Sequence, residues 1–335
     1  MRASLPSALA GIGAVLICAL HFTGFASSPG TDFFAEITGT PPQDTVKAAR
    51  ADSLYSRVQF SLWPGLSTNG DRSDLIVNGY SFNFIGGRSA GVRYTEFGLI
   101  INTVTDTLRG AQFALGFNRA RHVKSGAQFA FLANRSKAHM KGIQAALFNR
   151  AHVAEGMQIG LINVADSVKG TPVGFLSFVG TGGYKSVDLA FDETFRLNAS
   201  FATGMRHFYN LITAGASQRQ EGDAVWYLGY GVGTSPMLGE RLAVNVQLTT
   251  NYLMHGGESR FNLLNRFGAG LEYLLGDRVS AFAHVMINGL LHNDDFSFPG
   301  YTLPQRREPL ARERISDDLV LQVYPGLRLG LRLNW

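Results

Sequence analysis

Few residues in this chain have the types and spacing that catalysis requires. One local cluster, His292, Asn293, Asp294 and Asp295, lies at the start of a long polar segment at 291–318. A carboxylate beside an imidazole can act as a general base toward water. A solvated loop has the same composition, and other loops supply no matching partners for the cluster. We therefore expect no catalytic residue and no enzyme activity, and the segment to be a solvated extracellular loop or an inward-folded plug.

Histidines and arginines also recur between the repeats described below. Three histidines stand at spacings of 17 and 13 residues, and they would have to approach within a few ångströms to bind a metal ion. Neighbouring Arg and Lys residues oppose a cation there, so we expect no metal and no cofactor. The sharper alternative is that the basic groups donate charge-assisted hydrogen bonds to lipid phosphates. The histidines are His122, His139 and His152, and the candidate phosphate contacts are Arg119, Arg121, Arg135 and Arg150.

The composition excludes several classes of protein. The chain contains 39 glycines among 335 residues, which exceeds the average glycine content of about 7% in soluble domains. Charged residues make up 16% of the chain, below the average of about 25%. After the first thirty residues, no run of 18 apolar residues predicts a transmembrane helix. The 24 phenylalanines and 11 tyrosines argue against disorder. The sequence contains no phosphate-binding glycine loop, serine-nucleophile elbow or metalloprotease motif.

The first 53 residues predict export from the cytoplasm. Arg2 and an apolar stretch from Ala8 to Leu20 precede a small-x-small cleavage site, so residues 1–26 are a predicted signal peptide. The single cysteine, Cys18, lies within it, which leaves the mature chain without disulfides or thiolate metal ligands. Residues 27–53 are a predicted periplasmic linker. Export also argues against nucleic acid as a partner, although the net charge is +5.

From Tyr55 onward the chain alternates with the period of two that is typical of β-strands. In the run 242–254, apolar or aromatic residues at most even positions alternate with small, hydroxyl or amide residues at the odd positions from 243 to 251. These runs match the 9–11 residues that a tilted strand needs to cross a bilayer. The last run alternates Leu327, Leu329, Leu331 and Leu333 with polar or small residues, and it ends on Trp335. This ending resembles the C-terminal signal of bacterial outer-membrane barrels.

The middle of the chain is a repeat array. Residues 110–118 read GAQFALGFN, residues 126–134 GAQFAFLAN, residues 142–149 GIQAALFN and residues 156–163 GMQIGLIN. A short fixed period indicates one structural unit used repeatedly. The unit could be one strand of an antiparallel meander or one rung of a β-solenoid with stacked amides. The basic breaks favour the meander, because stacked rungs would bring like charges about 4.8 Å apart.

The GxQxxLxN array resembles the surface-repeat-containing outer-membrane proteins of Gram-negative bacteria. The segments that follow it, GTPVGFLSFVGTGGY, DETFRLNASFATGMRHFYN and WYLGYGVGTS, extend the resemblance over about residues 75 to 290. The resemblance implies β structure and an outer-membrane or surface location, and it supplies no catalytic residue. The chain departs from the family in Ala111 and Ala127, where bulkier aliphatic residues are usual, and in its basic turns.

Together these patterns predict an all-β protein of the cell outer membrane. We expect an antiparallel transmembrane β-barrel of about 14–16 strands over residues 54–335, with the repeat block at about 90–180 and a β-solenoid as the alternative for that block. The expected role is structural, passive transport or surface interaction; the alternative is a surface-displayed solenoid for adhesion or binding. Expected partners are outer-membrane lipid, lipopolysaccharide and the barrel-assembly machinery, which would act through the strand ending at Trp335. The predicted lumen-lining residues are Gln112, Gln128, Gln144, Gln158, Glu272 and His284.

Overall fold

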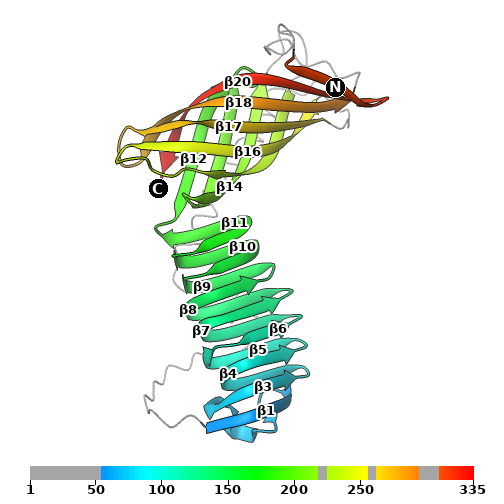
Figure 1. Ribbon diagram of the computed structural model, residues 1–335, viewed down its shortest axis with the longest axis vertical. Coiled ribbons are helices and arrows are strands. Elements are labelled where there is room, and N and C mark those ends of the chain that lie inside the picture. Colours follow the sequence, from blue (N-terminus) through cyan, green and yellow to red (C-terminus); the bar gives the residue numbers. More distant parts are fainter. Residues whose placement is uncertain (1–53, 218–224, 256–261, 294–308) are drawn as a thin grey trace. The chain divides into compact units, whose positions relative to one another are not determined.

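The computed structural model describes residues 54–217, 225–255, 262–293 and 309–335, which divide into two units at Gly182 and Gly183 (Figure 1). Both units consist of β-strands. The predicted signal peptide, the predicted linker and most of the polar segment 291–318 lie outside the described residues. Among those described, no helix is long and apolar enough to cross a membrane.

The first unit is a solenoid-like stack of parallel strands, called the solenoid below. After β1 (Leu54–Trp63), a short strand β2 (Leu66–Ser67) pairs with it antiparallel, and a 3-10 helix η1 (Gly70–Leu75) follows. All remaining strand pairs of this unit are parallel. The strands are β3 (Ile76–Asn83), β4 (Gly86–Gly98), β5 (Ile101–Leu108), β6 (Ala111–Ala114), β7 (Phe117–Ala130), β8 (Ala133–Ala145), β9 (Phe148–Ala154), β10 (Met157–Val168) and β11 (Thr171–Thr181).

The repeats stack residue upon residue, so the preferred meander is wrong and the solenoid alternative is correct for this block. Gln112 pairs with Gln128, which pairs with Gln144 and then with Gln158. A chain that pairs parallel with its own next copy must turn through a full rung between the two. The glycine that begins each repeat is needed for this stacking, because a Cβ atom on Gly156 would overlap the carbonyl oxygen of the preceding rung.

The second unit is a closed antiparallel barrel of eight strands. Its sheet runs in sequence order from β12 to β18 and then to β20, and β12 pairs with β20 to close it. A further strand, β19 (Ala311–Ser316), forms a hairpin with β20 and is exposed along its length. The barrel strands are β12 (Tyr184–Asp192), β13 (Leu197–Met205), β14 (Phe208–Ser217), β15 (Val225–Thr234), β16 (Leu242–His255), β17 (Leu263–Leu274), β18 (Val279–Asn293) and β20 (Leu319–Asn334).

The barrel is therefore smaller than predicted. It begins at Tyr184 and not near residue 54, and it has eight strands where the sequence predicted 14–16. The difference arises because the repeats have strand periodicity and were counted as spanning strands. Period-two alternation describes one strand and carries no information on which strand pairs with it.

The antiparallel order places the two ends of each strand on opposite rims of the barrel. One rim bears the start of β12, the end of β20 and the connections at 206–207, 235–241 and 275–278. The opposite rim bears the turn 193–196, the hairpin of β19 with β20, and the strand ends that flank residues 218–224, 256–262 and 294–310 in the chain. The solenoid is joined by Gly182 and Gly183 to the rim that carries the C-terminus.

Barrel side chains alternate between an apolar outer surface and a buried interior. On β20, Leu327 and Leu331 are more than half exposed, whereas Arg328 and Arg332 are buried. On β16, Leu248 is 54% exposed and its neighbours Gln247 and Thr249 are buried. The alternation predicted for these two runs is confirmed.

Candidate functional site

The barrel interior contains two charged clusters, and the first centres on Arg332 of β20. This side chain is fully buried, and its Nε and Nη2 atoms donate to the two carboxylate oxygens of Asp188, each at 2.7 Å. Nη1 donates to Glu272 on β17, which also accepts hydrogen bonds from Ser235 at 2.9 Å and Ser280 at 2.8 Å. The cluster thus joins β12, β17, β18 and β20 across the lumen. A bidentate arginine pair is both strong and geometrically specific.

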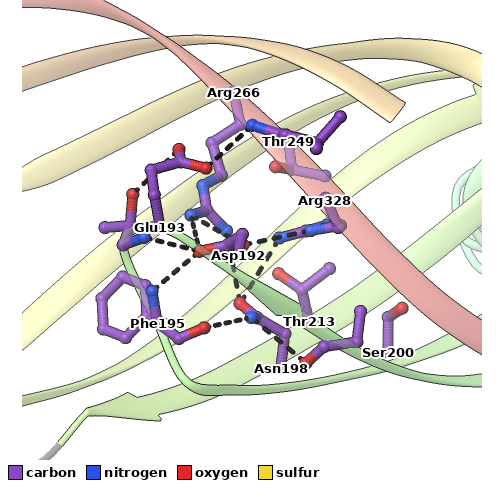
Figure 2. A network of polar contacts seen from close by, with 12 residues as sticks. Asp192, Glu193, Phe195, Asn198, Ser200, Thr213, Thr249, Arg266 and Arg328 are labelled. Atoms are coloured by element: carbon purple, nitrogen blue, oxygen red, sulfur yellow. Dashed lines mark hydrogen bonds and ion pairs between the residues drawn. The ribbon is translucent and has the colours of Figure 1, made fainter. Parts of the chain in front are cut away.

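The second cluster centres on Asp192, at the end of β12 (Figure 2). Its carboxylate is fully buried and contacts two arginines, Arg266 of β17 at 3.1 Å and Arg328 of β20 at 3.2 Å. The same carboxylate accepts backbone N–H groups of Thr194 at 2.9 Å and Phe195 at 2.7 Å. These two bonds fold the β12–β13 turn so that its carboxylate meets both guanidinium groups inside the barrel.

Asn198 completes the second cluster from β13. Its side-chain oxygen accepts hydrogen bonds from Arg266 at 3.3 Å and Arg328 at 3.4 Å, and its amide nitrogen donates to the carbonyl of Phe195 at 2.9 Å (Figure 2). The same oxygen accepts from the hydroxyl of Tyr227 at 2.7 Å. Two cations therefore share one carboxylate and one amide oxygen. A buried charge is tolerated only when it is paired in this way.

Glu193 ties the same turn to the closing strand. Its carboxylate accepts from Asn288 at 3.0 Å and from the backbone N–H of Leu327 at 2.8 Å. Gly326 leaves the room for this contact, since a Cβ atom there would overlap the carboxylate.

Apolar clusters close the interior toward each rim. Toward the rim with the β12–β13 turn, buried residues from six segments pack together, and the rings of Phe195 and Tyr227 meet edge to face at 4.6 Å. Toward the opposite rim, Tyr184 and Tyr209 pack with Ala202 and Leu211. The centroids of the two tyrosine rings are 4.8 Å apart. The apolar cluster toward the rim with the β12–β13 turn comprises Phe195, Val225, Tyr227, Leu253, Leu264, Leu290 and Tyr324.

Of the predicted lumen-lining residues, Glu272 and His284 lie inside the barrel and both are fully buried. Glu272 belongs to the Arg332 cluster. The ring of His284 lies 4.8 Å from that of Phe282, and neither of its nitrogens has a hydrogen-bond partner among the described residues. His292, from the predicted polar cluster, is buried at the end of β18.

The four predicted lumen glutamines lie in the solenoid interior instead, and this corrects their assignment. Each donates to the glutamine one rung before it: Gln158 to Gln144 at 2.9 Å, Gln144 to Gln128 at 2.8 Å and Gln128 to Gln112 at 2.7 Å. Gln112 donates to Glu96 at 2.7 Å, where the ladder ends. A parallel ladder runs through Asn83, Asn102, Asn118, Asn134, Asn149 and Asn163. These ladders satisfy buried amides from rung to rung, which a meander could not do.

The four arginines predicted to contact lipid phosphates lie on the solenoid surface. Arg119, Arg135 and Arg150 occupy equivalent positions in successive rungs, and Arg121 is exposed two residues after Arg119. Solvent screens these stacked cations, whereas the amide ladders lie in the interior. The charge repulsion that favoured a meander is therefore the weaker effect.

The three predicted repeat histidines do not converge on one point. The rings of His122 and His139 stack at 6.2 Å, and Nδ1 of His152 lies 2.6 Å from a carboxylate oxygen of Asp166. Within the described part of the chain, no group of three or more His, Cys, Asp or Glu side chains could hold a metal ion.

Comparison with known proteins adds little to this description. No family model matches the chain, and no curated protein matches it. Three chains among the solved structures match, and one of them is the crystal structure of Neisserial surface protein A (NspA). It is 12% identical, covers 46% of this chain and 98% of that chain, and has a TM-score of 0.27. At that TM-score the likeness carries no argument, so the eight-stranded barrel rests on its strand pairing. Membership of the surface-repeat family stays a prediction.

The sequence analysis did not single out Arg328 and Arg332. The signal that could have found them is their alternation with outward leucines, which places two charges at inward positions of the last strand. Their partners Asp188 and Asp192 lie more than 130 residues away in sequence. Only closure of the barrel brings β12 beside β20, so no local pattern could have paired them.

Proposed function

We propose that the barrel is a closed anchor in the bacterial outer membrane and that the solenoid is the interaction module it holds. No catalytic step is part of this proposal. The observation that carries it is the distribution of polarity in the barrel, where apolar side chains face outward and paired charges fill the interior.

The outer surface fits a lipid environment. Leucines, valines and isoleucines with about half of their surface exposed recur at alternate positions of β16, β17, β18 and β20. In water such a surface would drive association, whereas lipid solvates it without cost. Lipid cannot hydrogen-bond to the backbone, and each of the eight barrel strands, β12 to β18 and β20, pairs with a neighbour on both sides. These features support membrane insertion.

The interior favours an anchor over a passive pore. A wide selective pore carries rings of charge of one sign that face water. Here Arg332 and Arg266 are instead paired with carboxylates and fully buried, and apolar clusters lie toward both rims. Eight-stranded barrels have an interior just wide enough for side chains to fill.

The connections favour an orientation for the barrel. Outer-membrane barrels have short periplasmic turns and longer extracellular loops. The rim with the shorter connections is also the rim at which β12 begins, directly after the solenoid in the chain, and at which β20 ends. The solenoid then faces the periplasm, and the terminal strand ending at Trp335 is available to the barrel-assembly machinery. Trp335 stacks on Phe201 at 6.2 Å, which fixes this end of the closing strand.

Heat-modifiable migration tests the anchor proposal. Full-length protein folded into lipid vesicles should migrate faster on an SDS gel before boiling than after it, because a closed barrel resists SDS. The membranes should also retain it through carbonate washing. Migration that boiling leaves unchanged, together with release by carbonate, would refute a membrane-embedded barrel.

A further inference from the structure

One side of the solenoid displays a continuous uncharged surface along eight rungs, called the apolar face below. Three outward positions per rung form it. The first two are in register with their equivalents in the neighbouring rungs, and the third lies two residues further along the chain in every rung. The first column is Val58, Tyr80, Thr95, Ala111, Ala127, Ile143, Met157 and Thr171; the second is Phe60, Phe82, Phe97, Phe113, Phe129, Ala145, Ile159 and Val173; the third is Leu62, Phe84, Leu99, Leu115, Phe131, Leu147, Leu161 and Phe175.

The apolar face is unusually exposed. Phe84 and Phe131 each have 66% of their surface exposed. Phenylalanine rings stack along the middle column, with centroids 5.1 Å apart between Phe97 and Phe113 and 5.2 Å apart between Phe113 and Phe129. Behind this face lie the buried amide ladders, so polar groups are inside and apolar groups outside. Exposed apolar surface of this extent indicates a site of interaction.

Columns of basic residues border the apolar face on both sides. On one side, Arg119, Arg135 and Arg150 are in register with one another, and each follows a residue of the third column by three or four positions. On the other side, before the first column, Lys124 and Lys141 are in register. Lys169 continues that side two rungs later and pairs with Glu155 at 3.2 Å.

The net positive charge of the chain comes from the solenoid. Residues 54–182 contain 13 Lys and Arg against 6 Asp and Glu, whereas residues 183–335 contain 14 against 15. The solenoid is therefore basic and the barrel is close to neutral. An apolar surface between basic borders is the arrangement of elements that lie in a membrane interface, where long cationic side chains reach phosphates.

We propose that the apolar face rests on an anionic phospholipid leaflet, with its side chains among the upper acyl chains and the bordering cations at the phosphates. This deepens the proposed function, on which it rests, by naming what the interaction module binds. A second copy of the chain fits less well, because face-to-face packing of two copies brings basic columns of the same sign together at both edges. A leaflet supplies phosphates at those edges instead.

Trp63 provides a natural reporter, since it directly follows Leu62 at the end of the face and is 56% exposed. The sequence has three tryptophans, so the full-length W226F/W335F variant keeps Trp63 alone. The protein is reconstituted in vesicles of phosphatidylglycerol and phosphatidylcholine with bromine atoms near the headgroup end of the acyl chains. We expect bromine to quench most of the Trp63 fluorescence and the quenching to weaken at least twofold in vesicles of phosphatidylcholine alone.

Two variants separate the apolar and basic contributions. F113E/F131E places charges on the face and should abolish the quenching, and R135Q/R150Q should make it insensitive to phosphatidylglycerol. The control R72Q removes an exposed arginine of η1, which belongs to the same unit but lies outside the bordering columns, and should behave as the parent. Heat-modifiable migration is measured in every sample, so loss of the barrel is distinguished from loss of the leaflet contact.

Two results would overturn the proposal while migration remains heat-modifiable. One is Trp63 fluorescence that brominated lipid leaves unchanged. The other is a stable dimer, detected by mass in detergent, that F113E/F131E converts to monomer; that result would assign the apolar face to a second copy of the chain.

Discussion

At the scale of single residues, Glu96 occupies an unusual place in the solenoid. It stands in register with the ladder glutamines, and its carboxylate accepts from Gln112 at 2.7 Å and from Asn83 at 2.9 Å. Each ladder glutamine donates toward the preceding rung, whereas each ladder asparagine donates toward the following one. A carboxylate can only accept, so Glu96 is a suitable end for the glutamine ladder and joins it to the asparagine ladder.

Burial raises the pKa of Glu96 above its ordinary value of 4.5, and hydrogen bonds from Gln112, Asn83 and Ser81 oppose the shift only in part. The folded state therefore binds the proton more tightly than the unfolded state. The stability that this proton contributes is present at low pH and is lost as the pH rises through the folded-state pKa.

We expect E96Q to remove this pH dependence. Urea unfolding of the solenoid is followed by Trp63 fluorescence in the W226F/W335F background. As the pH is raised from 4.5 to neutrality, the urea concentration at the unfolding midpoint should fall more for the parent than for E96Q. Parallel pH profiles for the two proteins would contradict the assignment.

At the scale of secondary-structure elements, the alternation within strands was predictable and the pairing between them was not. The outward leucines of the last strand and the apolar positions of 242–254 follow directly from the sequence. The repeat period was equally visible, but a strand of a meander and a rung of a solenoid have the same local pattern. The buried amide ladders decide between them, and they exist only once Gln112 lies beside Gln128.

Closure of the barrel depends on charged contacts between its first and last strands. R332M would leave Asp188 and Glu272 buried without their cation, and breaking a buried pair in this way costs roughly 3–5 kcal/mol. We expect unfolding at a clearly lower urea concentration, measured by loss of the fast-migrating band. R241M, which removes an exposed arginine from the connection 235–241, should leave the midpoint unchanged. Equal midpoints for the two variants would show that the cluster is not structural.

At the scale of the whole molecule, charge and polarity distinguish the two units. The barrel exposes apolar side chains around a polar interior, and the solenoid does so on one side while carrying the excess positive charge. The low charge content visible in the sequence thus has two origins. The sequence did not separate them, because both units alternate and both are rich in phenylalanine or leucine.

The orientation is testable in intact cells. An epitope inserted between β18 and β19 should bind antibody from outside, because this is the longest connection of its rim. An epitope inserted between Thr68 and Asn69 of the solenoid should bind only after the outer membrane is permeabilised. The opposite pattern would place the solenoid on the cell surface, as an adhesion module.

The proposed membrane anchor requires a barrel wall that faces lipid on the outside and packed side chains on the inside. Spin labels placed one at a time along residues 243–252 of β16, in protein folded into vesicles, measure both properties by their collision with oxygen and with a water-soluble nickel complex. We predict that Val244, Val246, Leu248, Thr250 and Tyr252 positions collide with oxygen, and that Ala243, Asn245, Gln247, Thr249 and Asn251 positions collide with neither reagent. High nickel accessibility at the second set would reveal a water-filled pore, and nickel accessibility at both sets would contradict a membrane-embedded barrel.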